Sequence, residues 1–363
     1  MLVPVADPRR GVEALRSELD SAVGRVLESG RYILGPEHDL FEAELATYLG
    51  VRHCVALASG TDALEMAFRC VGGQRNHIVT AANAGFYSTA AAHRAGLRVR
   101  YADVDSDTLT LSRATLEEEL APEVRAVVVT HLYGVMAEIE SVVELCHARG
   151  IRVVEDCAQA AGARRGGRAA GTFGDVAAFS FYPTKNLPAL GDGGAIATND
   201  DDLAGRARTL RQYGWTEKYR VTATGGVNSR LDEIQAAILR TRLPYLDGWN
   251  ERRRSIVARY ADALSPAAGR MVRLDGPDYV AHLAVMLAGD REVVRAHLYA
   301  AEIGTDVHYP IPDHRQPVWG ETLVEQGQLP ATEHAAEHVL SLPCFPELTD
   351  NEVTRVCEAL HEL

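Results

Sequence analysis

The chain has 363 residues, 47% of them hydrophobic, and a net charge of −13. This acidic balance argues against a nucleic-acid or anionic-membrane binder, and no stretch of about 18 apolar residues predicts a membrane span. The six cysteines form no CxxC pair, so we expect no bound metal, and they fit the cytoplasm. The length predicts a large domain over residues 1–245 and a smaller one over 246–363.

Helical and extended patterns alternate in the first part of the chain. Apolar residues at three- and four-residue spacing predict helices over 12–29 and 38–49. Seven short apolar runs follow: Cys54–Ala58, Ile78–Ala81, Arg98–Val104, Ala126–Leu132, Ile151–Glu155, Val176–Phe181 and Gly194–Thr198. Helical stretches at 62–71, 88–95, 112–120 and 138–149 separate the first five runs. This alternation predicts an α/β fold, with a seven-stranded, mostly parallel sheet between layers of helices.

The pattern changes after Thr198. We predict a helix over 201–212 and then a loop, Arg211–Asn228, that is rich in aromatic, glycine and basic residues. A long helical segment begins at Leu231 and breaks at Pro244, because proline disrupts a helix interior, and this break sets the domain boundary near residue 245. The remaining segment mixes a few short strands with helices at 249–264, 290–302, 332–340 and 350–362, the last with a capping box over Thr349–Glu352.

Lys185 is the first candidate for chemistry. It lies on a glycine-rich connection between two apolar runs, where a lysine is not needed for solubility. A desolvated lysine has a lowered pKa and can condense with a carbonyl group. The alternative is a surface lysine in a turn, but Asp156, at the end of another apolar run, argues against it. Pyridoxal phosphate requires a lysine for its Schiff base and an acid beside its pyridine nitrogen, so the pair predicts this cofactor.

Several motifs support that prediction together: Ala58–Leu64, His131–Gly134, Glu155–Gln159, Phe179–Leu187, Asn228–Glu233 and His308–Pro310. With them the chain resembles, over nearly its whole length, the DegT/DnrJ/EryC1/StrS family of pyridoxal-phosphate-dependent sugar aminotransferases. The resemblance implies a fold-type I aminotransferase with a smaller α+β C-terminal domain. It also implies that Lys185 holds the cofactor and then moves the proton between substrate and cofactor, while Asp156 keeps the pyridine nitrogen protonated. Family dehydratases carry His at the lysine position, so Lys185 disfavours that reaction.

The remaining cofactor residues are implied by the same resemblance. Gly60 and Thr61 open a helix after the first strand, and a helix N-terminus can bind phosphate, although an ordinary helix cap looks the same in sequence. The family pattern assigns the cofactor phosphate to these two residues and Ser180, and the phenolic oxygen to Gln159. Asn228 matches the position that reaches the phosphate across a dimer interface, so we expect a homodimer with shared active sites.

One stretch departs from the family pattern. Where an aromatic residue stacks on the cofactor ring, this chain has Asn83-Ala84-Gly85-Phe86-Tyr87. The register favours Phe86 for the stacking position, with Tyr87 as the adjacent alternative. His131 ends a strand run, and we interpret it as structural.

We expect the substrate to be a nucleotide-linked, most simply dTDP-linked, keto-deoxyhexose, with L-glutamate as amino donor and C3 favoured over C4. Lys218 and Arg230 provide cations for a diphosphate, and the resemblance places His308 and Tyr309 over the sugar. Two alternatives remain open at this point. One is an aminotransferase for a keto-cyclitol, and the other is a catalytically silent regulatory protein that binds pyridoxal phosphate.

Overall fold

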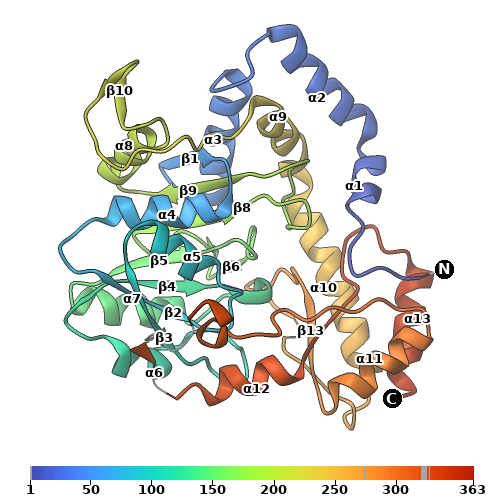
Figure 1. Cartoon of the computed structure of the whole chain (residues 1–363). Helices are drawn as coiled ribbons and strands as arrows, with labels where there is room; N and C mark the ends of the chain where they lie inside the picture. The colour runs from blue at the N-terminus through green and yellow to red at the C-terminus, as the bar shows by residue number, and fades with distance from the viewer. Residues whose placement is uncertain (1, 274, 320–324, 327) are drawn as a thin grey trace.

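The computed structural model describes residues 2–273, 275–319, 325–326 and 328–363. Its main sheet has eight strands in the order β1-β9-β8-β5-β4-β2-β3-β14 (Figure 1). The seven predicted runs all form strands of this sheet: β1 (His53–Leu57), β2 (His77–Ala81), β3 (Arg98–Ala102), β4 (Val124–Thr130), β5 (Arg152–Asp156), β8 (Val176–Ser180) and β9 (Gly194–Thr198). The eighth strand is the two-residue β14 (Glu325–Gln326), which the sequence did not predict.

The sheet is parallel except at β9, which runs antiparallel to both β1 and β8. Register places the ends of neighbouring parallel strands together, and Asp156 of β5 lies opposite Ala178 of β8. Because the carboxyl ends of parallel strands share one edge, the residues that follow β1, β5 and β8 converge there.

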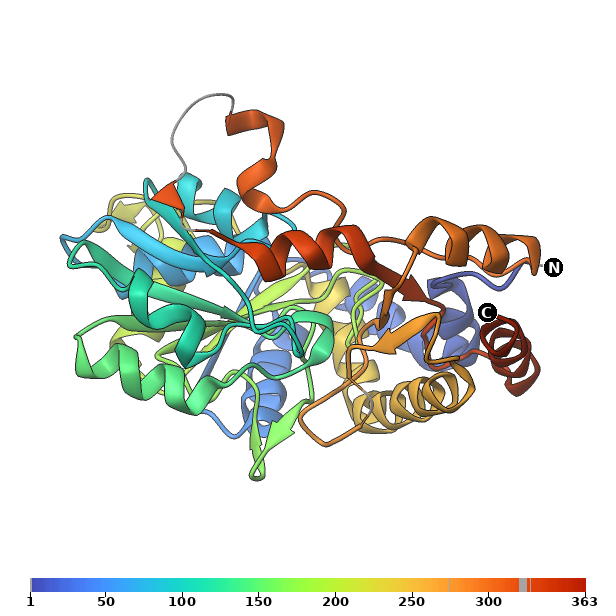
Figure 2. The same ribbon diagram turned by 90° about the horizontal axis from the view of Figure 1, so that it is seen from below.

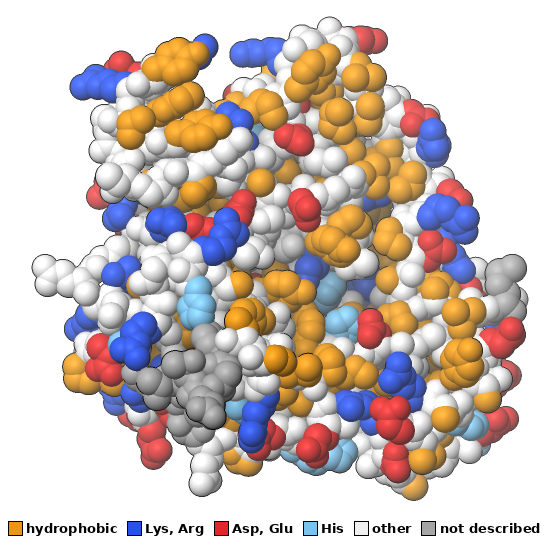
Figure 3. Space-filling view, viewed as in Figure 1, with side chains coloured by type: hydrophobic (Ala, Val, Ile, Leu, Met, Phe, Trp, Pro, Cys, Tyr) orange, Lys and Arg blue, Asp and Glu red, His pale blue; other side chains and the backbone are white. Residues whose placement is uncertain are grey.

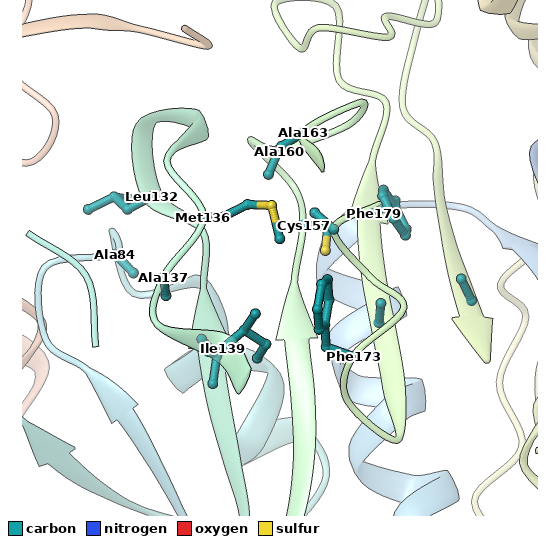
Figure 4. Close-up of a cluster of buried hydrophobic side chains, with 14 of the residues drawn as sticks. Ala84, Leu132, Met136, Ala137, Ile139, Cys157, Ala160, Ala163, Phe173 and Phe179 are labelled. Carbon is teal, nitrogen blue, oxygen red and sulfur yellow. The ribbon is translucent and has the colours of Figure 1, made fainter. Parts of the chain in front are cut away.

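Both faces of the sheet are buried under helices. Alternate residues of β4 enter two different cores: Val127 and Val129 contribute to one, Ala126 and Val128 to the other. The first core includes residues of α3 (Pro36–Leu49), α7 (Ile139–Ala148) and α9 (Glu233–Arg242), and Figure 4 shows part of it. The second includes residues of α4 (Gly60–Val71), α5 (Tyr87–Arg94) and α8 (Asp201–Leu210). Burial on both faces explains why the β4 sequence is apolar without alternation.

A third core lies in the C-terminal part of the chain (Figure 2). It contains the small antiparallel sheet of β12 (Gly269–Met271), β13 (Ala284–Ala288) and β15 (Val339–Leu342), with the helices α10 (Leu246–Ala263), α11 (Arg291–Ala300) and α13 (Asp350–His361). Val3 packs in this core and pairs with Ile303. The domain boundary near residue 245 stays a prediction, and it falls in a short 3₁₀ turn, Leu243–Tyr245, between α9 and α10.

Three local expectations differ from the structure. The predicted helix 12–29 is two helices, α1 (Pro8–Ala14) and α2 (Arg16–Ser29), because Leu15 leaves helical geometry at φ −120° and ψ 25°. The expected 211–228 loop contains a hairpin of β10 (Trp215–Glu217) and β11 (Arg220–Val221). The expected helix 112–120 is α6 (Arg113–Leu116) followed by a 3₁₀ turn.

Other elements follow the sequence more closely. The chain also forms α12 (Pro330–His338) and a two-residue ribbon of β6 (Arg164–Arg165) and β7 (Arg168–Ala169). The predicted capping box of α13 is present, since Thr349 and Glu352 bond to each other's backbone N–H groups. Within the described ranges no helix has both the length and the apolar character that crossing a membrane requires.

Candidate active site

A cavity of about 590 Å³ lies at the carboxyl edge of the main sheet, between that sheet and the C-terminal part of the chain. Figure 3 shows this face of the molecule, with lysine or arginine and histidine side chains gathered in the hollow at its centre. The cavity brings together most of the residues predicted for the site: Gly60, Thr61, Asp156, Gln159, Ser180, Lys185, His308 and Tyr309.

Lys185 and Asp156 form the charged centre of the cavity. Burial lowers the pKa of the Lys185 amine to about 8, and the Asp156 carboxylate partly opposes this shift. Asp156 is 5% exposed, accepts the Ala158 N–H at 3.0 Å and faces the Thr130 hydroxyl at 3.4 Å. Burial raises the pKa of Asp156. A lysine with this pKa has about a tenth of its amine in the neutral, nucleophilic form at pH 7, far more than an ordinary lysine has.

The start of α4 and Ser180 form a cradle for an anion. Ser59 caps the helix by accepting the Asp62 N–H at 3.1 Å, and the first N–H groups of a helix have no acceptor within it. A Cβ on Gly60 would lie 2.6 Å from Cβ of Ser180, so any larger residue would displace that side chain. A Cβ on Gly194 would lie 2.2 Å from the carbonyl oxygen of Ser59. The two glycines thus keep N–H groups and a hydroxyl open to a phosphate group.

Gln159 connects the sheet side of the cavity to its opposite wall. Its Oε1 accepts the Tyr133 N–H at 2.6 Å, and its Nε2 donates to the Tyr309 hydroxyl at 3.1 Å. The Tyr133 hydroxyl donates in turn to the carbonyl oxygen of His308 at 2.5 Å. These bonds fix His308 and Tyr309 relative to the end of β5.

The loop before α5 supplies an aromatic ring to the same wall. Tyr87 lines the cavity, and its ring centroid lies 6.1 Å from that of Tyr309. Phe86, at φ 70°, is not among the lining residues of the described chain. The assignment of the stacking ring to Phe86 stays a prediction. The ring that lines the cavity is that of its neighbour, Tyr87.

Asp313 holds that loop in place, although no sequence motif predicted this role. Its buried carboxylate accepts the Phe86 N–H at 2.7 Å and the Thr89 hydroxyl at 3.1 Å. Asp313 thus tethers the N-cap residue of α5 and, through the Thr89 hydroxyl, its first turn, from a position 224 residues away in sequence. Burial raises the pKa of Asp313 to about 7.

Besides Phe86, three predicted residues lie outside the main cavity. Asn228 and Arg230 line a neighbouring cavity of about 660 Å³, which shares Ser59 and Asp192 with the first. Lys218 lies in the β10–β11 turn, with its Nζ 5.1 Å from the ring centroid of Tyr219. A single chain therefore does not place these three groups beside Lys185.

His131 is buried beneath the site. Its Nε2 lies 3.0 Å from Glu155, and its Nδ1 accepts the Ala137 N–H at 3.1 Å. Glu155 also accepts backbone N–H groups of the 171–174 turn, and its pKa is low despite the burial because His131 and these N–H groups stabilise the anion. The structure gives His131 a place in a buried polar network under the strand end.

The fold, with Lys185 and Asp156 facing one cavity at the strand ends, defines a fold-type I aminotransferase that uses pyridoxal phosphate. The model of the DegT/DnrJ/EryC1/StrS aminotransferase family matches residues 13–361. The chain belongs to this family of pyridoxal-phosphate-dependent sugar aminotransferases.

Individual relatives agree with this assignment. The chain is 43% identical to a dTDP-3-amino-3,4,6-trideoxy-alpha-D-glucose transaminase of Streptomyces venezuelae, over 99% of this chain and 96% of that protein. It is 40% identical to a dTDP-3-amino-3,6-dideoxy-alpha-D-galactopyranose transaminase of Aneurinibacillus thermoaerophilus, over 99% of both. The crystal structure of S. venezuelae DesV in complex with a ketimine intermediate superposes with a TM-score of 0.95 at 42% identity, over 99% of this chain and 98% of that one.

Proposed function

We propose that this enzyme transfers an amino group from L-glutamate to C3 of a dTDP-linked keto-deoxyhexose. The observation that carries the chemistry is the Lys185–Asp156 pair, which shares one cavity with an anion cradle at the start of α4. Two relatives, both dTDP-3-amino-sugar transaminases, support the choice of nucleotide and of the aminated carbon.

The residues present fit pyridoxal phosphate in the proposed roles. Gly60, Thr61 and Ser180 would hold the phosphate, and Gln159 would face the phenolic oxygen. Asp156 would hold a proton on the pyridine nitrogen, since a cation there offsets the cost of a buried carboxylate. When bound, the cofactor withdraws electrons from the carbon next to the substrate nitrogen.

Lys185 would perform the proton transfer. With its amine released, Lys185 takes a proton from the substrate carbon and returns it to the cofactor side, acting first as base and then as acid. Its pKa of about 8 suits both directions near neutral pH. Tyr87, Tyr309 and His308 line the opposite wall, and they would cover the ring system and the sugar.

We further propose that the working form is a homodimer with shared active sites. Asn228 and Arg230 line the adjoining cavity, and Lys218 projects on the exposed hairpin, so a second subunit could receive them. The hairpin also carries the exposed side chains of Tyr219 and Val221, which favours burial against another copy.

The direct test offers dTDP-linked 3-keto and 4-keto deoxyhexoses to the enzyme with L-glutamate, and reads the position of the new amine by NMR. Amination at C3 supports the proposal, and amination at C4 alone contradicts it. A keto-cyclitol in the same panel tests the alternative substrate class. A shift of the cofactor absorbance on adding L-glutamate tests the donor separately and would exclude a catalytically silent protein.

A further inference from the structure

One residue, Asp313, bonds to both ends of the loop before α5. Its backbone N–H donates to the carbonyl oxygen of Ala82 at 2.7 Å, where the loop begins. Its carboxylate accepts the Phe86 N–H at 2.7 Å and the Thr89 hydroxyl at 3.1 Å, where the loop joins the helix. The Asp313 side chain is 1% exposed, and hydrogen bonds are stronger where water is excluded. Asp313 therefore fixes the path of residues 83–86 from both ends.

The backbone of this loop is in an unfavourable conformation. Gly85 and Phe86 are consecutive, and both have a positive φ, of 79° and 70°. A residue other than glycine rarely adopts this region, and it stays there only when surrounding contacts hold it. The bonds to Asp313 are contacts of this kind, so we expect the loop to change its path when they are removed.

Tyr87 follows directly after the loop, and its ring lines the main cavity. The centroid of this ring lies 6.1 Å from that of Tyr309, and the two rings meet edge to face. The Tyr309 ring also lies against Gly85, because a Cβ on that glycine would be 2.8 Å from it. Tyr309 is four residues before Asp313 in the chain. Asp313 thus joins the two segments whose rings form the cavity wall opposite the sheet.

The cofactor and the sugar depend on this wall to different degrees. The cofactor has anchors on the sheet side, where Lys185, Asp156 and the phosphate cradle lie. Tyr87 is 50% exposed whereas Asp156 is 5% exposed, so the Tyr87 ring lies toward the mouth of the cavity. A substrate that enters through the mouth meets this ring. A deoxyhexose is apolar where its hydroxyl group is missing, and aromatic side chains pack against such surface.

We propose that Asp313 is a positioning residue for the sugar substrate and that it acts through Tyr87. Asp313 is buried and is not among the residues of the described chain that line the main cavity, so it does not recognise the sugar directly. This inference rests on the proposed aminotransferase function, and it adds the residue that holds a sugar-binding ring in place. Loss of the carboxylate should weaken sugar recognition and leave the L-glutamate half-reaction nearly unchanged.

The test compares Asp313→Ala with Asp103→Ala as a matched control. The Asp103 carboxylate accepts the N–H groups of Ala331 and Thr332 at 2.9 and 2.8 Å, so it also tethers the start of a helix that is distant in sequence. That helix is α12, none of whose residues lines the main cavity. Single-turnover absorbance of the holoenzyme measures each half-reaction. We expect the half-saturating concentration of the dTDP-linked keto-sugar to rise about tenfold in Asp313→Ala and less than about threefold in Asp103→Ala, with that of L-glutamate within about threefold in both.

A double-mutant cycle with Tyr87→Ala shows whether Asp313 acts through this ring. Once Tyr87 is replaced, the further loss of Asp313 should change the half-saturating sugar concentration by less than about threefold. Asp313→Asn should stay within about threefold of wild type, because its amide oxygen can accept the Phe86 N–H and its amide nitrogen can donate to the Thr89 oxygen. Additive effects of the Asp313 and Tyr87 substitutions, or equal damage to both half-reactions, overturn the proposal.

Two further measurements cover a variant that does not fold and a substrate that is wrong. If Asp313→Ala does not fold, Thr89→Val removes one of the bonds to Asp313 and should raise the half-saturating sugar concentration about threefold, but not in the Tyr87→Ala background. An unchanged value in Thr89→Val then overturns the proposal. Hydrogen exchange of residues 83–89 requires no substrate and should be about tenfold faster in Asp313→Ala than in wild type. A wild-type enzyme that aminates no keto-sugar contradicts the proposed function, and the exchange rates still decide whether Asp313 holds the loop.

Discussion

The two walls of the active-site cavity are built in different ways. On the sheet side, the register of β5 and β8 and the start of α4 place Asp156, Ser180 and Gly60, so backbone hydrogen bonds set their positions. On the opposite side, single side-chain contacts hold the wall: Gln159 to Tyr309, and Asp313 to the loop before α5.

We relate this difference to the two tasks of the site, which are cofactor chemistry and recognition of the sugar. A position fixed by a sheet register shifts only if the strands slip, whereas a position fixed by one side chain shifts with one substitution. The sheet wall therefore suits the cofactor, which is the same for every member of the family. The side-chain wall suits the sugar, which differs among relatives. The substitutions below test this separation, beginning with the largest expected effect.

Lys185→Ala on the sheet wall should abolish transamination. We expect turnover to fall at least about 1000-fold, because the variant loses both the cofactor attachment and the proton carrier. The melting temperature should stay within about 3 °C of wild type, because removing a partly desolvated charge costs the fold little. Steady-state assays and circular dichroism check the two parts. Normal multiple turnover without added amine would contradict the assignment.

Asp156→Asn should have the next largest effect. The amide keeps the size of the side chain and can still accept the Ala158 N–H, but it cannot stabilise a protonated pyridine nitrogen. We expect both half-reactions to slow by about 100-fold or more, measured in single turnover. A variant that loses only the sugar half-reaction would place Asp156 in recognition instead.

On the side-chain wall, Asp313→Asn should change how the free energy of unfolding depends on pH. The native pKa of Asp313, about 7, lies above the unfolded value, so its contribution is full at low pH and is lost as pH rises through 7. Between pH 5.5 and 8.5 the wild type should lose about 2 kcal/mol relative to the asparagine variant. Urea unfolding at both pH values measures this difference. A difference that does not vary with pH would show that the carboxylate is not buried as described.

Gly85→Ala should have the smallest effect and act on recognition alone. Gly85 has φ +79°, and a Cβ there would lie 2.8 Å from the Tyr309 ring. We expect the KM for the keto-sugar to rise about tenfold, with the L-glutamate half-reaction nearly unchanged. Gly96→Ala is the control, since Gly96 has φ +75° but no atom within 4 Å of an added Cβ. Equal effects of both substitutions would assign the loss to backbone strain.

Much of the sheet wall could be predicted from the sequence, because it follows local patterns. Apolar runs of strand length located the seven strands, and Asp156 and Ser180 were recognised from the motifs at the strand ends. The eighth strand is two residues long, too short for any periodic signal. The split at Leu15 was missed because α1 and α2 share one apolar spacing across it.

The side-chain wall was predicted less completely, because contacts between segments far apart in the sequence form it. His308 and Tyr309 were found through a motif, but Asp313 has no local signal that separates it from a surface charge. Only its burial and its contacts identify it, because its carboxylate accepts from a loop 224 residues away in sequence. The proposed contribution of Lys218 and Asn228 to a second subunit depends on an assembly that one chain does not contain.

The bonds between Asp313 and the start of α5 have a consequence for synthesis of the protein. During translation, residues 87–94 leave the ribosome long before residue 313. Until then the Phe86 N–H and the Thr89 hydroxyl lack this acceptor, and an eight-residue helix is marginal alone. The sheet wall can form on the nascent chain, whereas the side-chain wall can form only after the C-terminal segment has left the ribosome. A ribosome-bound fragment that ends at residue 300 should therefore bury its sheet but leave α5 open to proteases.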